Sequence, residues 1–326
     1  MSRLPLVSPL DRVLFLKTQP YLAGVSPSVL TALASYTEES VYRAGATIRE
    51  PGAPVDRIVF IGGGQIEVGG TTAGDHASRS ISAPGAIGFA HHFAPAYDAP
   101  AVRARTDAMC LEIDVDDLDQ ILEDHFSALM QVAETTCLQA TLTMRALGDR
   151  RPPVVGYSQP TRGQTPSELD LVARLALLKQ VPFLAGTNLG VLSELARFDP
   201  PRSLNVGEVL WREGEVIDRM VVVLDGAFRS QGRFGSVLSP AGATIGANEM
   251  FLEEPRFEGW VAHEPSRVIS IERELFIDVL EDHFEFAQTY LGRVSSYLIE
   301  GWDALVKHGA QRDDSVSPSY SAEIRV

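Results

Sequence analysis

Residues 245–262, with the sequence IGANEMFLEEPRFEGWVA, have the form of a turn that holds a phosphate group. Gly246 is followed by a short run with helical character, then by Pro255 and Arg256, and then by residues typical of a strand. Backbone N–H groups at the start of such a run favour an anion, and a guanidinium makes forked, charge-assisted hydrogen bonds to phosphate oxygens. The pattern therefore predicts an anion-binding turn in this part of the chain.

The elements around this turn occur twice in the chain. Residues 15–37 match residues 177–199, and the alignment continues without a gap to residues 68 and 230. A second matched block closes with the pentapeptide LEDHF in both copies. Repetition at this spacing indicates duplicated structural units. Identical residues at paired positions include Gly45/Gly207, Gly52/Gly214, Asp56/Asp218, Arg57/Arg219 and Gly64/Gly226.

The segment between the copies is rich in proline and in small polar residues, which is typical of a linker. We therefore predict a first domain at 1–148, a linker at 149–168, a second domain at 169–310 and a polar tail at 311–326. The chain length of 326 residues fits two domains of about 100–200 residues each.

Each copy opens with apolar residues at helical spacing, continues with short alternating strands that end at glycine turns, and closes with helical patterns. The opening helix is marked by Val29, Leu30 and Leu33 in the first copy. This order predicts a mainly β fold with flanking helices, arranged as two β-rolls, or jelly rolls, in tandem.

Each copy resembles a cyclic-nucleotide-binding domain, the module of the catabolite activator proteins and of the regulatory subunits of protein kinase A. The residues that carry the resemblance are PYLAG and PFLAG, the Gly–x6–Gly–x3–Asp-Arg pattern at 45–57 and 207–219, the apolar strand before Gly64 or Gly226, and the phosphate turn. The resemblance covers roughly 15–148 and 172–308. It implies that the arginine of the turn binds a cyclic phosphate and that a glutamate after the glycine accepts a hydrogen bond from the ribose.

In the second copy the resemblance places Ala247 at the glutamate position and keeps Arg256. A cyclic nucleotide or a cyclic dinucleotide is the ligand that it implies; the alternative is that the turn is only structural. The candidate ligand-binding residues are Ile245, Gly246, Ala247, Asn248, Glu249, Pro255, Arg256 and Phe257.

The first copy carries a more altered turn, with Gly88 kept, Phe89 at the glutamate position and Asp98 at the arginine position. A carboxylate at the place of the cation repels an anion. We therefore predict a degenerate site in the first domain that does not hold a standard cyclic nucleotide.

Two functions fit these observations: a sensor of an anionic nucleotide-like ligand, or a ligand-free scaffold that binds a protein partner. No catalytic motif is present, so we expect no enzyme and no metal. A cupin-like metalloenzyme using His91 and His92 and a DNA-binding regulator are weaker alternatives. A net charge of −15 and the lack of a visible helix-turn-helix disfavour DNA.

An apolar stripe with aromatic residues runs along the closing helix of the second copy, at 285–306. It predicts either packing within the chain or a seam for a homodimer or a protein partner. The two cysteines, Cys110 and Cys137, form no disulfide framework, and no apolar run is long enough to span a membrane. We therefore expect a cytoplasmic protein.

Overall fold

The computed structural model describes residues 8–69, 78–154, 156, 170–197, 200–252 and 255–307. It divides into a first unit that ends at Gln139 and a second unit that begins at Ala140. The predicted polar tail at 311–326 lies outside the described residues, as does most of the predicted linker. The beginning of that linker, from residue 149 to residue 154, belongs to the second unit.

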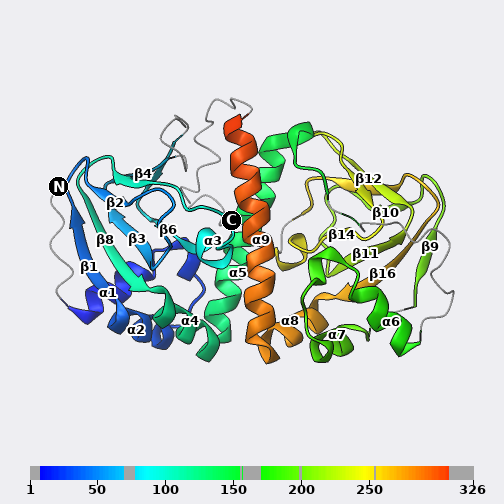
Figure 1. Ribbon diagram of the computed structural model, residues 1–326, viewed down its shortest axis with the longest axis horizontal. Helices are drawn as coiled ribbons and strands as arrows, with labels where there is room; N and C mark the ends of the chain where they lie inside the picture. Colours follow the sequence, from blue (N-terminus) through cyan, green and yellow to red (C-terminus); the bar gives the residue numbers. More distant parts are fainter. Residues whose placement is uncertain are drawn as a thin grey trace. The chain divides into compact units, whose positions relative to one another are not determined.

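The first unit contains two four-stranded antiparallel sheets (Figure 1). One sheet has the strand order β1-β8-β3-β6 and the other has the order β2-β7-β4-β5. The strands are β1 (Glu38–Tyr42), β2 (Thr47–Arg49), β3 (Arg57–Gly63), β4 (Gln65–Val68), β5 (Arg79–Ser82), β6 (Gly85–Ile87), β7 (Val102–Ala104) and β8 (Ala108–Asp114).

The second unit repeats this topology strand for strand. Its sheets have the orders β14-β11-β16-β9 and β10-β15-β12-β13, which correspond to those of the first unit when the first order is read in reverse. The strands are β9 (Arg202–Leu204), β10 (Val209–Trp211), β11 (Arg219–Asp225), β12 (Ala227–Gln231), β13 (Leu238–Pro240), β14 (Thr244–Ile245), β15 (Gly259–Ala262) and β16 (Ser266–Glu272). The prediction of two tandem β-rolls is confirmed.

Helices flank each β-roll, and local signals set where they begin. Ser8 and Asp11 form a capping box at the start of α1, and Ser26 with Pro27 starts α2. In the first unit α2 contacts α4, and α4 contacts β8. The helices are α1 (Pro9–Leu16), α2 (Pro27–Tyr36), α3 (Phe89–Phe93), α4 (Val115–Asp124), α5 (Phe126–Leu147), α6 (Leu171–Leu178), α7 (Leu189–Leu195), α8 (Arg273–Asp282) and α9 (Phe284–Lys307), with short 3₁₀ turns η1 (Pro20–Leu22), η2 (Gly148–Arg150), η3 (Pro182–Leu184) and η4 (Glu249–Phe251).

The repeated glycines occupy positions that require glycine. Gly64 and Gly226, which join β3 to β4 and β11 to β12, have φ values of +84° and +80°. A Cβ at either position would also collide with neighbouring atoms, those of Asp107 in the first unit and of Ser266 in the second. Because only glycine adopts this backbone without strain, the matched glycines mark matched hairpin turns.

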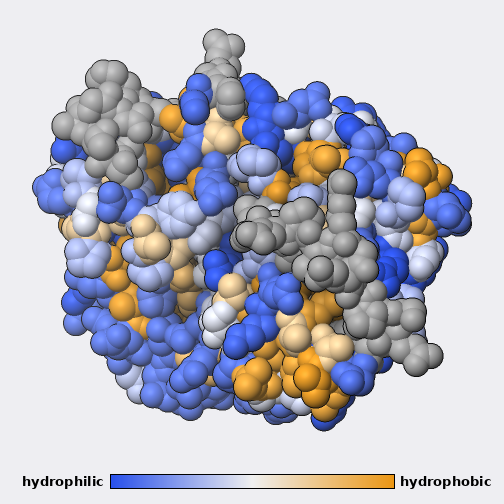
Figure 2. Space-filling view, turned by 45° about the vertical axis from the view of Figure 1, so that its right-hand side comes forward, coloured by the Kyte–Doolittle hydropathy of each residue, from blue (hydrophilic) through white to orange (hydrophobic). Residues whose placement is uncertain are grey.

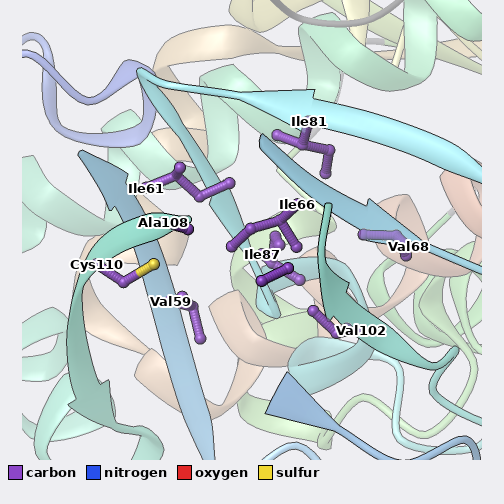
Figure 3. Close-up of a cluster of buried hydrophobic side chains, with 10 residues drawn as sticks. Val59, Ile61, Ile66, Val68, Ile81, Ile87, Val102, Ala108 and Cys110 are labelled. Carbon is purple, nitrogen blue, oxygen red and sulfur yellow. The ribbon is translucent and has the colours of Figure 1, made fainter. Parts of the chain in front are cut away.

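Between its two sheets the first β-roll encloses a cluster of aliphatic side chains, shown in Figure 3. The equivalent cluster of the second β-roll contains two large aromatic residues, Phe228 and Trp260. On the face shown in Figure 2, hydrophilic residues predominate and apolar residues form small groups between them. Among the described helices, none combines the length and the hydropathy needed to cross a bilayer.

The apolar stripe of α9 is largely buried within the single chain. Tyr290, Leu291, Val294 and Leu298 are each at most 2% exposed. Further along α9, Gly301 packs closely against Thr143 and Met144 of α5. The structure therefore accounts for most of the stripe by packing inside the chain, which was one of the two expectations for it.

Candidate functional site

The turn of the second unit begins where β14 ends. Gly246 has a φ of +86°, a conformation that favours glycine. A Cβ at this position would meet Ile217 Cδ1 at 2.7 Å and the ring of Trp211 at 3.3 Å. The Met250 amide then donates to the Gly246 carbonyl at 3.0 Å as the chain enters η4. The glycine and the short helical run expected from the sequence are therefore both present.

Arg256 turns inward and is only 4% exposed. Its guanidinium carbon lies 4.7 Å from the centre of the Trp211 ring, and its Nη2 lies 3.6 Å from Glu249 Oε1. Its Nε donates a long hydrogen bond of 3.4 Å to the Glu258 carbonyl. A buried guanidinium is stable only where such contacts replace water, so Trp211 and Glu249 are the groups that hold this charge.

A second buried ion pair lies beside Arg256. Arg151 Nη1 is 2.9 Å from Glu258 Oε2, and both side chains are at most 5% exposed. Burial raises the pKa of Glu258, while the neighbouring Arg151 cation lowers it. Burial also raises the pKa of the Tyr297 hydroxyl, and the Glu249 carboxylate raises it further. Two cations and two carboxylates therefore share one buried region, and their formal charges cancel.

Aromatic residues occupy the inner face of the sheet next to these charges. Trp211 of β10 is paired in register with Trp260 of β15. Trp260 is 6% exposed and belongs to the core cluster together with Phe228 and Ile245. Two indole rings therefore lie next to each other at the interior of the second β-roll beside the turn.

The turn is also attached to the closing helices. The Tyr290 hydroxyl of α9 donates to the Ala247 carbonyl at 3.2 Å. Phe251 of η4 packs against Tyr290 and against Phe276 of α8, with ring centroids 5.3 Å and 6.0 Å apart. A displacement of the turn would therefore disturb α8 and α9 directly.

The candidate residues of the second unit differ in what they contact. Gly246, Glu249 and Arg256 come together with Trp211, as described above. Ile245 is in the core, Asn248 makes no capping hydrogen bond, Pro255 is exposed, and Phe257 packs on Phe234. These residues do not fit a cyclic nucleotide of the usual kind, because Ala247 offers no acceptor for a ribose hydroxyl and a carboxylate already faces Arg256.

The turn of the first unit is built from different contacts. Gly88 has a φ of +119° and begins the turn, as Gly246 does. Phe89 is 2% exposed and stacks on Tyr21, with ring centroids 4.1 Å apart. Asp98 is exposed, so its carboxylate lies at the surface and not in the β-roll interior where an arginine would be needed.

His91 and His92, the residues of the metalloenzyme alternative, lie in the short helix α3. His92 Nε2 is 2.8 Å from Asp119 Oδ1. Burial, together with the positive charges of Arg79 and Arg49, lowers the pKa of His91 to about 4. Among the described residues, no three His, Cys, Asp or Glu side chains form a group that could hold a metal ion.

Two residues of the second site could not be found from the sequence pattern. Arg151 stands in a segment whose prolines indicate a linker, and its partner Glu258 is far away in the chain. Trp211 belongs to a strand that alternation predicts, but nothing in that alternation shows that its ring lies under Arg256. Both contacts depend on the folded topology.

Comparison with known proteins finds one family match, which lies within the second unit. Residues 201–283 match the family model described as a cyclic nucleotide-binding domain. No curated protein matches the chain.

Similar solved structures include the regulatory domain of protein kinase A from Toxoplasma gondii with cAMP, at 16% identity, with 88% of this chain and 96% of that chain covered and a TM-score of 0.33. A regulatory subunit of a cAMP-independent protein kinase A from Trypanosoma cruzi, bound to guanosine, is 15% identical, with 92% of each chain covered and a TM-score of 0.31. A cyclic nucleotide-binding-like protein from Brucella abortus is 26% identical over 33% of this chain and 97% of that chain, with a TM-score of 0.28.

These TM-scores are low, so the likeness rests on the family match and on the duplicated fold. The family match covers the second β-roll. The first unit has the same strand order, and positive-φ glycines stand at matched positions in both units, at Gly45/Gly207, Gly52/Gly214, Gly64/Gly226 and Gly88/Gly246. Residues 201–283 therefore match a cyclic nucleotide-binding domain, and the first unit repeats the strand order of that region.

Proposed function

We propose that this chain is a non-catalytic regulatory protein whose second β-roll works as a ligand-independent scaffold for a protein partner. The observation that carries the proposal is the buried charge network of the second unit. Arg256 faces Glu249 and lies on Trp211, while Arg151 and Glu258 form an ion pair. The protein's own carboxylates thus occupy the surroundings of the guanidinium that would otherwise bind a phosphate.

Electrostatics supports this proposal. An anion that approached Arg256 would meet the Glu249 and Glu258 carboxylates in a region with little water, where repulsion between like charges is only weakly screened. The missing ribose acceptor at Ala247 removes a charge-assisted hydrogen bond, and each such bond is worth roughly 1.5–3 kcal/mol. Loss of one bond weakens binding by about 10- to 100-fold.

Calorimetric titration of the full chain with cAMP, cGMP, guanosine and a cyclic dinucleotide tests the proposal. We expect no binding heat, and we expect the variant Arg256→Gln to behave like the wild type in these titrations. A nucleotide that co-purifies with the protein, or micromolar binding that Arg256→Gln abolishes, would contradict it.

The second candidate function is a sensor of a nucleotide-like anion, and one observation favours it. Arg256 Nη1 and Nη2 make no hydrogen bond within the described part of the chain. Buried donors without acceptors are rare, and a ligand oxygen would satisfy them. In a sensor, the ligand would displace Glu249, and Tyr290 would carry the change from the turn to α9.

The variant Glu249→Gln separates the two functions. It removes the negative charge beside Arg256 and keeps the size of the side chain. For a sensor, we expect this variant to bind the anionic ligand more tightly than the wild type. For a scaffold, the variant gains no ligand, and its only change is in stability.

A further inference from the structure

Two arginines stand at opposite ends of one row that crosses the second sheet of the first β-roll. Arg49 pairs with Val102, Val102 pairs with Val68, and Val68 pairs with Arg79. Paired residues of neighbouring strands project from the same face of a sheet. Val68 and Val102 belong to the interior cluster, at 4% and 1% exposure. Both arginines therefore stand on the inner face of the sheet.

Two local features agree with this placement. The register shifts between Thr47 and Arg49, and a bulge of this kind re-aims the side chains of the bulged strand. In β5, Ile81 lies two residues after Arg79 and therefore on the same face, and Figure 3 shows Ile81 among the interior side chains.

A third basic side chain near Arg49 and Arg79 comes from helix α3. His91 is half-buried, and both Arg49 and Arg79 act on it electrostatically. The carboxylate of Asp56 also acts on Arg49, but Asp56 is exposed. The arginines of β2 and β5 therefore both lie within electrostatic range of the His91 ring of α3.

Arg49 supplies the observation that points to a ligand. Its Nε and Nη2 atoms are shut off from solvent and make no hydrogen bond within the described residues. Buried donors nearly always have an acceptor, because leaving one unmade is costly. Among the described residues, the half-buried guanidinium has no acceptor at two of its nitrogens.

We propose that Arg49, Arg79 and His91 bind a small phosphate-type anion in the first β-roll. The side chains next to them on the sheet are aliphatic, as Figure 3 shows for Val68, Ile81 and Val102, and they offer no hydrogen bonds to a ribose or a base. The ligand class is therefore inorganic phosphate or a small phosphomonoester.

The equivalent row of the second β-roll takes its cation from the turn and not from the strand. Trp211 pairs with Trp260, and Trp260 pairs with Ser230. Trp211 thus holds the place of Arg49, and the guanidinium that lies over it comes from Arg256 of the turn. In the first β-roll the strand itself provides the cation, and Asp98 at the turn stays at the surface.

The test uses the full chain, with phosphate binding followed by calorimetry and by the shift in thermal unfolding. We expect binding at millimolar phosphate, at least about tenfold weaker binding in Arg49→Gln, and unchanged binding in the control Arg103→Gln. Arg103 is exposed and projects from the other face of the neighbouring strand β7. Equal binding in the two variants, or no binding by the wild type, overturns the proposal.

Two further measurements test the phosphate site without relying on the folding of Arg49→Gln, and they distinguish it from a site in the second unit. Phosphate should raise the pKa of His91 in the wild-type protein, followed by NMR, because the anion stabilises the imidazolium. Loss of phosphate binding in Arg256→Gln would instead assign the anion to the second unit and overturn the proposal. Parallel titration with methyl phosphate distinguishes a phosphomonoester ligand from free phosphate.

Discussion

The variant Arg151→Met tests the buried ion pair that closes the second unit. Arg151 and Glu258 are 2.9 Å apart and at most 5% exposed, so the substitution leaves a carboxylate in a region with little water. Removal of one partner of a buried pair costs about 3–5 kcal/mol, whereas replacement of both partners by apolar residues is close to neutral. We therefore expect Arg151→Met to lower the free energy of unfolding by about 3–5 kcal/mol.

The loss should depend on pH in a definite direction. Burial already raises the pKa of Glu258, and removal of Arg151 takes away the cation that lowers it. The folded variant then binds a proton more tightly than the unfolded chain, so its stability falls as the pH rises through the raised pKa. The deficit of Arg151→Met is accordingly largest at neutral pH and shrinks toward acidic pH, where Glu258 becomes neutral.

Urea unfolding of the full chain, followed at several pH values, measures these differences. The control is Arg150→Met, because Arg150 is exposed and surface substitutions usually change stability by less than about 0.5 kcal/mol. The double variant Arg151→Met/Glu258→Met completes a thermodynamic cycle. The reasoning is refuted if the double variant loses the sum of the single losses, or if Arg151→Met unfolds like Arg150→Met.

Three further predictions concern the two turns. Tyr290→Phe removes the hydrogen bond to the Ala247 carbonyl and should lower the free energy of unfolding by about 1 kcal/mol in urea unfolding, with no loss of helix in circular dichroism. Gly246→Ala imposes a Cβ at a φ of +86° and 2.7 Å from Ile217 Cδ1; it should cost at least about 1–3 kcal/mol by the same assay, and a neutral effect would contradict the turn geometry. His91 has a pKa lowered to about 4, so the unfolded chain takes up its proton first and stability falls as the pH drops from about 6.5 toward 4; His91→Gln should flatten that part of the pH profile of thermal unfolding.

The sequence predicted the architecture well because the fold depends on local signals that are repeated. Glycines at matched positions correspond to positive-φ turns in both units, as Gly64 and Gly226 show. The helical spacing of Val29, Leu30 and Leu33 predicted α2, whose buried face contains these residues. Such signals are visible in a linear pattern because each requires only a few neighbouring residues.

The candidate site was predicted only in part, because its contacts join distant segments. The sequence identified Gly246 and Arg256, but not the partners that surround the guanidinium. The convergence of Arg49 and Arg79 depends on strand register and on a bulge, which a sequence pattern does not specify. The sequence predicted that the carboxylate of Asp98 repels an anion. That effect requires the side chain to point into the β-roll, whereas Asp98 is exposed.

The position of Arg151 has a consequence for dividing the protein into separately expressed fragments. The compact second unit begins at Ala140, within α5, and Asp149 accepts a hydrogen bond from the Ser236 amide at 2.7 Å. A fragment that starts at residue 169, the border that the repeat suggests, would lack Asp149 and Arg151. Glu258 would then lose the cation that it pairs with. The two halves of the duplication are therefore not equivalent as fragments, since the second β-roll depends on residues 149–151, which precede its own repeat.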